Sequence, residues 1–246
     1  MMSLSSRSHQ PASAGRPQAM PENRSVMTLY TNPRFEKALA KALDDWATAD
    51  MALSAGLALC EHGEGFVVVS FFGRRYRVSH PGGAVEEMRE GPPAGDGDSG
   101  DSSRPVHVSI VILMLHYLLT ADATPQEDRW VTFRELPGGL FYASAFESHA
   151  EATLAKLVAP DDADPSVPIF RRNGANLGGV DLDLADAAMS FQALPRLRVA
   201  ALLWKGDDEF PGQARILFDA SARHYLPTED LAGLGDWLAH QLVRVG

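Results

Sequence analysis

Three acidic side chains stand side by side at Asp207, Asp208 and Glu209, between a strand-like run that ends at Trp204 and another that begins at Ala214. Neighbouring carboxylates are ligands that hard cations such as Mg²⁺ or Ca²⁺ prefer. The spacing differs from that of the calcium-binding loop, which alternates its acids and adds a distant glutamate. Two interpretations stay open: a cation site, or a hairpin turn whose acids face solvent.

A second group of polar residues follows where a strand gives way to a helix. Asp219 ends the strand, His224 and Tyr225 stand in the connection, and Glu229 lies in the first turn of the helix. A histidine with nearby carboxylates can do acid–base work. The glycines of a nucleophile elbow are missing around Ser221, which weakens it as a nucleophile. The alternative is a capped helix entered through a rigid Leu-Pro turn.

The run RELPGG at 134–139 is a third candidate. Arg134 can hold an anionic group through two parallel hydrogen bonds, and the two glycines let a ligand approach the backbone. The alternative is an ion pair between Arg134 and Glu135 at a strand end. Catalytic residues, metal ligands and cofactors stay unassigned, and the candidate ligand-binding residues are Arg134, Glu135, Trp204, Asp207, Asp208, Glu209, Asp219, His224, Tyr225 and Glu229.

Composition and missing motifs narrow the function classes. The net charge of −10 disfavours nucleic acid as a partner, because phosphate backbones attract basic surfaces. The Walker P-loop, the dinucleotide fingerprint and the HExxH zinc motif do not occur. One cysteine, Cys60, forms neither an internal disulfide nor an iron–sulfur cluster alone, and it fits the reducing cytoplasm. The apolar run 106–119 is too short to cross a bilayer, so no membrane partner is expected.

Hydrophobic periodicity predicts the elements that position these residues. A helix is expected to start near Pro33 and to continue toward Leu59, with a stop at His62 and Gly63. The last helix should begin after Pro227, with Thr228 as its N-cap. Apolar or alternating runs predict strands at 66–72, 74–79, 84–89, 130–136, 189–194, 197–204 and 214–219, and helices at 106–119, 141–158 and 169–176.

Hairpins dominate over strand–helix–strand units in this order. The expected fold class is therefore α+β, with a largely antiparallel sheet of hairpins packed against several helices in a single domain. Residues 1–30 have the composition of a flexible tail, and Met1, Met20 or Met27 can each be the true start. Residues 31–246 form the domain, and the acidic segment 90–104 reads as a disordered loop within it.

Four of these stretches also carry a resemblance to a known family. FRELPGG at 133–139, LLWKGDDEFP at 202–211, ILFD at 216–219 and YLPTEDL at 225–231 resemble the bacterial and archaeal DUF3786 family, whose function is not established. The resemblance covers roughly residues 34–244. Some members look like fusions with an iron–sulfur domain of the type found in corrinoid proteins of anaerobic one-carbon metabolism. With one cysteine, this chain lacks that cluster.

Three functions remain open. The first is a cytoplasmic binding or accessory protein that holds a tetrapyrrole, a corrinoid-like or another anionic ligand, or docks a redox or one-carbon enzyme. The second is an enzyme with a carboxylate-rich, metal-assisted site. The third is a structural or oligomerising domain. The absence of catalytic motifs and the fusions implied by the resemblance favour the first, with a small molecule or a protein as partner and the oligomeric state open.

Overall fold

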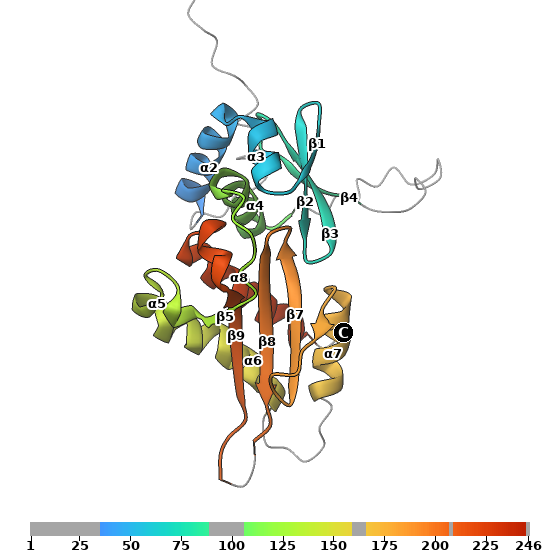
Figure 1. The fold of residues 1–246 in the computed structure, drawn as a ribbon, viewed down its shortest axis with the longest axis vertical. Coiled ribbons are helices and arrows are strands. Elements are labelled where there is room, and N and C mark those ends of the chain that lie inside the picture. The colour runs from blue at the N-terminus through green and yellow to red at the C-terminus, as the bar shows by residue number, and fades with distance from the viewer. Residues whose placement is uncertain (1–34, 89–105, 159–165, 207–208, 245–246) are drawn as a thin grey trace, which may run out of the picture.

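The computed structural model of the chain describes residues 35–88, 106–158, 166–206 and 209–244, and only the backbone of Ser166. Two antiparallel sheets, each accompanied by helices, follow one another along the long axis of the molecule (Figure 1). The tail expected at 1–30, the loop expected at 90–104, and Asp207 and Asp208 lie outside the described residues.

The first sheet has the strand order β1-β2-β3-β4. Its hairpin between β2 and β3 turns at Gly73, where a φ of 76° suits a residue without a Cβ atom. The buried face of α2 carries Leu39, Leu43 and Trp46, and α2 packs against α4. The elements of this part are α2 (Glu36–Thr48), α3 (Met51–Leu57), β1 (Glu61–Gly63), β2 (Phe66–Phe71), β3 (Arg74–Ser79), β4 (Val85–Met88) and α4 (Val108–Thr120).

The second sheet has the order β5-β9-β8-β7-β6. Side chains alternate along its strands, so that Val199 and Ala201 of β8 face the main core, whereas Ala200 and Leu202 belong to a small cluster on the other face. Trp204 packs against that small cluster. The strands are β5 (Trp130–Thr132), β6 (Val180–Asp181), β7 (Ala187–Leu194), β8 (Leu197–Trp204) and β9 (Gln213–Asp219).

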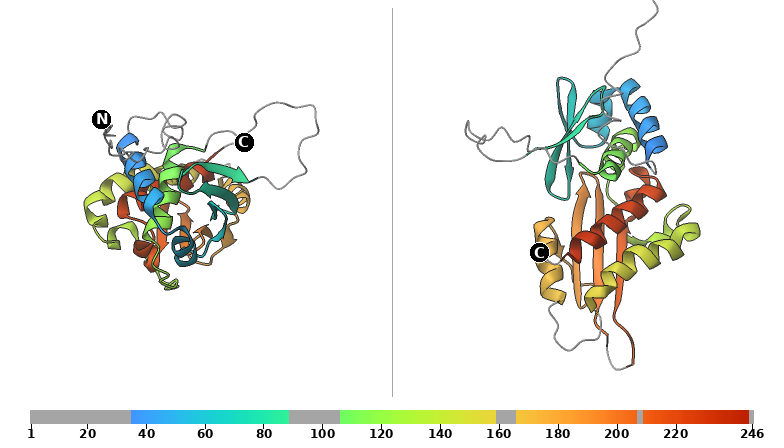
Figure 2. Two further views of the ribbon diagram at one scale, coloured as in Figure 1. Left: turned by 90° about the horizontal axis from the view of Figure 1, so that it is seen from above. Right: turned by 180° about the vertical axis from the view of Figure 1, so that it is seen from behind.

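Helices cover one face of the second sheet. Seen from behind, α8 crosses that face, and the segment from α5 to α6 runs beside it (Figure 2). Because α8 also contacts α4, one continuous buried core joins the two sheets. The remaining elements are the 3₁₀ turns η1 (Phe133–Glu135), η3 (Lys156–Val158) and η4 (Ala220–His224), the π-helical η2 (Glu147–Glu151), and α5 (Gly139–Phe146), α6 (Ala152–Ala155), α7 (Ser166–Asn176) and α8 (Thr228–Leu242).

The expected α+β class with antiparallel hairpins is confirmed, and the hairpins form two sheets. The helix expected from Pro33 to Leu59 is interrupted, because Asp50 accepts a hydrogen bond from the Leu53 N–H (3.0 Å) and caps a new helix, α3. His62 and Gly63, expected to stop that helix, belong to β1.

Two further expectations about element ends are wrong. The strand expected at 130–136 ends at Thr132, because Thr132 and Glu135 form a capping box that starts a 3₁₀ turn. The N-cap of α8 is Pro227. The hydroxyl of Thr228 donates to the Pro137 carbonyl (2.6 Å) and ties α8 to the turn before α5.

One side chain closes part of the edge of β9. β5 pairs with β9 from Leu217 to Asp219. At Ile216, the backbone N–H donates to the carboxylate of Glu151 (3.1 Å), which also accepts from Arg215 (2.6 Å).

Among the described helices, none is both long and apolar enough to cross a membrane.

Candidate functional site

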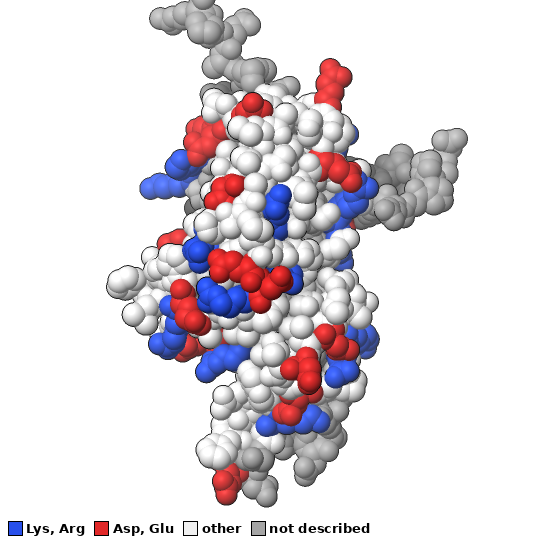
Figure 3. Space-filling model, viewed as in Figure 1, with Lys and Arg blue, Asp and Glu red and all other residues white. Residues whose placement is uncertain are grey.

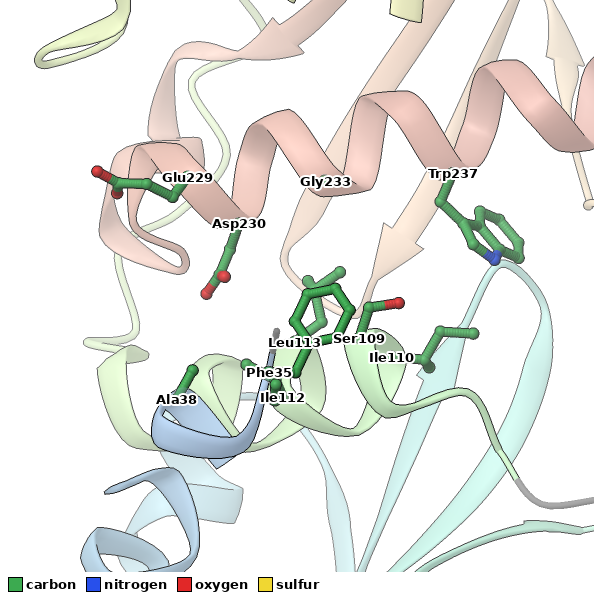
Figure 4. A pocket seen from close by; sticks show the side chains of 10 residues that line it. All are labelled: Phe35, Ala38, Ser109, Ile110, Ile112, Leu113, Glu229, Asp230, Gly233 and Trp237. Carbon is green, nitrogen blue, oxygen red and sulfur yellow. The ribbon is translucent and has the colours of Figure 1, made fainter. Parts of the chain in front are cut away.

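A cavity of about 140 Å³ lies between α4 and α8, close to the start of α2. We call it the α4–α8 pocket. Figure 4 shows its walls: Phe35 and Leu113 on one side, Gly233 and Trp237 of α8 on the other, and Asp230 reaching into the space between them. Its lining is mostly apolar, with carboxylates at one end.

The sequences of two helices explain this cavity. α4 is apolar nearly all round, so it keeps apolar side chains on the face toward the pocket as well as in the core. α8 buries Leu231, Leu234 and Leu238 and turns Gly233 toward the pocket. A Cβ atom at Gly233 would meet no atom within 4 Å. The glycine therefore leaves open a space that any other residue would narrow.

Asp230 supplies the polar end of the pocket. Its Oδ2 accepts a hydrogen bond from His116 Nδ1 (2.5 Å), and both side chains are mostly buried, with 17% and 26% of their surface exposed. Among the described residues, none donates to the other oxygen, Oδ1. Glu229, also at the pocket, turns its carboxylate away from the cavity in Figure 4. The site therefore offers one positioned acceptor beside apolar walls.

Arg134 and Glu135 lie elsewhere, and their partners differ from the expected ion pair. The guanidinium of Arg134 donates to both carboxylate oxygens of Glu147 (2.8 and 3.0 Å). This hydrogen bond holds the pKa of Glu147 below its ordinary value. Glu135 accepts from the backbone and hydroxyl of Thr132 (2.8 Å each). Arg134, Glu147, Glu151 and Arg215 line a separate cavity of about 100 Å³, in which the charges pair with one another.

Asp219 is completely buried and organises the connection before β5. Its carboxylate accepts from the backbone N–H groups of Glu127, Asp128 and Ser221 (3.0 Å each), from the Ser221 hydroxyl (2.6 Å) and from Arg198 (3.0 Å). Burial opposes ionisation, but these hydrogen bonds outweigh it and lower the pKa of Asp219. Figure 3 shows acidic and basic side chains lying close together near the middle of the molecule, in the same view as Figure 1.

His224 and Tyr225 attach to the same connection. His224 Nδ1 bonds Asp122 Oδ2 (2.7 Å) and lies 3.3 Å from the Thr124 hydroxyl. The buried Tyr225 donates its hydroxyl to the Thr124 carbonyl. Hydrogen bonds from the side chain and backbone of Thr124, and then from His224, lower the pKa of Asp122 to about 2. Asp219, His224 and Tyr225 thus all meet the segment 122–128.

The eight candidate residues that the structure describes therefore do not share one pocket, and Asp207 and Asp208 lie outside the described residues. Glu229 lines the α4–α8 pocket, and Arg134 lines the separate, charge-paired cavity. Trp204 packs against the small cluster of Ala200 and Leu202 on the face of the second sheet away from the main core, and Glu209 is exposed. Within the described residues, no group of three or more histidine, cysteine or acidic side chains is arranged to hold a metal ion.

The sequence patterns placed Asp230 in the first turn of the last helix but missed its pairing with His116. They are 114 residues apart, so no local spacing links them. Gly233 left a weak signal, because a glycine inside a helical pattern costs stability and calls for a reason.

Cys60 gives a first test of the local environment. Burial, followed by the charge of Glu61, raises the pKa of its thiol to about 12. Because the thiolate is the reactive form, we expect iodoacetamide at pH 8 to alkylate the folded protein much more slowly than the chain in urea. Mass spectrometry over time measures both rates. Equal rates in the two conditions would contradict the buried position of the thiol.

The comparisons with known proteins give one match. No curated protein and no solved structure matches the chain. A family model matches residues 47–241, a range that includes α4, all of α8 but its last residue, and the polar end of the pocket. The chain belongs to the family described as "Domain of unknown function (DUF3786)".

Proposed function

We propose that this protein is a binding or accessory module that receives one basic, partly apolar side chain of a partner in the α4–α8 pocket. The observation that carries this proposal is the position of Asp230. Its Oδ2 is held by His116, its Oδ1 has no donor among the described residues, and the side chain lines a mostly apolar cavity. An acceptor in such a place gains stability from a donor, and most from a charged one.

The size of the cavity supports a side chain as the occupant. A dry cavity of about 150 Å³ holds a molecule the size of benzene, and pockets for drug-sized ligands span roughly 300–1,000 Å³. At about 140 Å³, the α4–α8 pocket matches one aromatic or long aliphatic group. This size favours the protein-partner form of the binding hypothesis over the tetrapyrrole form.

The chemistry of the walls supports a basic group with an apolar stem. Lysine and arginine lay their methylene groups along apolar surfaces and keep the charge at a polar end. Leu113 and Trp237 offer the apolar surface, and Asp230 offers the polar end. An anionic ligand gains nothing from this arrangement, and Arg134 is already engaged by both oxygens of Glu147.

The cellular part of the proposal rests on the composition of the chain and on the family resemblance. The cytoplasm as its location is proposed from the single cysteine. A redox or one-carbon enzyme as the partner is proposed from the fusions that the family resemblance implies. Neither part is needed for the test of the pocket.

Benzamidinium, a cation that carries its charge on one benzene ring, is a suitable probe of the pocket. We expect millimolar binding, with NMR shift changes confined to α4, α8 and the start of α2, and at least about tenfold weaker binding in Gly233→Leu. The new side chain fills the cavity, and it stabilises the helix by about 1 kcal/mol relative to glycine, so the fold is retained.

The matched control is Gly56→Leu in α3, where a Cβ atom also meets nothing within 4 Å but which does not line the α4–α8 pocket. It should bind the probe like the natural protein. Benzoate, the anion of similar shape, should bind more weakly than benzamidinium. Stronger binding of benzoate, or unchanged binding in Gly233→Leu, would refute the proposal. Spectral change on titration with cobalamin or haem would instead favour the tetrapyrrole form.

A further inference from the structure

The α4–α8 pocket opens where the described part of the chain begins. Phe35 is the first described residue, and its side chain lines the pocket. The 34 residues that precede it are covalently attached at the mouth of the cavity. A residue five positions before Phe35 lies within about 17–18 Å of it even in a fully extended chain. Leu29 and Tyr30 are therefore within reach of the pocket.

The charge of this segment is opposite to that of the rest of the chain. Residues 1–34 contain four arginines and one acid, Glu22, out of 22 basic and 32 acidic residues in the whole chain. Residues 35–246 are left with 18 basic and 31 acidic side chains. The polar end of the pocket carries Asp230 and Glu229. Charge complementarity thus favours the chain's own N-terminal segment as an occupant.

We propose that residues 22–34 occupy the α4–α8 pocket, with Leu29 or Tyr30 in the cavity and Arg24 or Arg34 beside Asp230. The inference rests on the proposed function and deepens it, because it names a built-in competitor for the partner's side chain. The segment keeps the apolar walls covered until a partner with a better anchor displaces it.

Tethering makes even a weak contact effective. A short flexible linker gives an effective concentration in the millimolar range, so a segment with millimolar affinity occupies the pocket for much of the time. A ligand's apparent affinity falls by the fraction of molecules whose pocket is open. When the effective concentration equals the dissociation constant of the segment, about half of the pockets are open, so removing the anchor side chains should raise the apparent affinity for benzamidinium about twofold.

The test compares three chains of the whole sequence: the natural one, Leu29→Ala with Tyr30→Ala, and the control Met2→Ala with Leu4→Ala, which lies outside residues 22–34. One readout is the dissociation constant of benzamidinium. The other is the NMR signal of the Trp237 indole N–H, assigned with Trp237→Phe. We expect tighter probe binding and a shifted Trp237 signal only in the Leu29/Tyr30 variant. The gain should shrink in 1 M salt, where the Debye length is about 3 Å.

The outcomes separate this inference from the proposed function. Equal probe affinity and an unchanged Trp237 signal in all three chains would overturn the inference and leave the pocket proposal standing. A shifted Trp237 signal without any probe binding would support the segment and refute the basic-anchor proposal. No binding and no shift would overturn both. A Trp237 signal that moves with protein concentration would show a second copy in the pocket and refute the segment.

Discussion

Replacing Asp219 with alanine is expected to destabilise the protein by about 3–5 kcal/mol, the cost of breaking a buried, hydrogen-bonded charge pair. The substitution leaves Arg198 without its buried partner and strips three backbone N–H groups of their acceptor. One of them belongs to Asp128, whose φ of 54° is left-handed and unfavourable outside glycine. Urea unfolding followed by circular dichroism measures the loss.

Two variants calibrate this result. Asp128→Asn removes an exposed charge that also pairs with Arg198 and keeps a residue type that tolerates the left-handed backbone, so it should cost at most about 1 kcal/mol. Asp219→Asn keeps the shape and removes the charge. Because the folded pKa of Asp219 is lowered, its ionised form stabilises the fold above pH about 4 and loses that contribution as the pH falls through the lowered pKa. The stability gap between the natural protein and Asp219→Asn should therefore narrow in acid. A gap independent of pH would contradict this.

Replacing Trp46 with alanine should cost a similar amount, about 3–5 kcal/mol. Its ring is completely buried between α2 and the end of β3, it stacks edge-on against His80, and its indole N–H donates to the Ser79 carbonyl (2.8 Å). The cavity left behind loosens α2, which carries Ala38 into the wall of the α4–α8 pocket. Thermal unfolding and benzamidinium binding should both change.

Trp46→Phe provides the graded control. It keeps an aromatic ring and loses the hydrogen bond. The Ser79 carbonyl still accepts from the Gly83 N–H (2.9 Å), so the loss should cost only about 0.5–1.5 kcal/mol. If phenylalanine and alanine destabilised the protein equally, the hydrogen bond rather than the packing of the ring would hold α2 in place.

Local signals in the sequence predicted the elements well where one pattern acted alone. The hairpin at Gly73 and the three strands at 187–219 followed from alternation and turn residues. Errors arose where a side chain competed with the pattern. Asp50 capped a new helix inside an apolar repeat, and the T-x-x-E sequence of Thr132 and Glu135 ended a strand early. Both are helix-capping patterns, which an interpretation based on hydrophobic periodicity alone does not take into account.

The site was much less predictable, because its geometry depends on contacts between distant segments. His116 meets Asp230 across 114 residues, and Asp122 meets His224 across 102. Runs of polar residues looked like sites because their side chains can bind ligands or transfer protons. In the structure, however, Asp219 and Arg134 form hydrogen bonds with other side chains of the protein. The pocket depends on the absence of a side chain at Gly233, and a search of the sequence for reactive side chains does not detect a glycine.

The contact between Glu151 and β9 also bears on how the protein avoids aggregation. A strand edge with unpaired N–H groups is a template on which a second chain can add its own strand. Glu151 occupies the Ile216 N–H just beyond the last residue that β5 covers, and it places a charge beside that edge. The π-helical turn η2, which ends at Glu151, thus makes this part of the β9 edge a poorer template for strand addition by a second copy. This effect is separate from the stability of a single molecule.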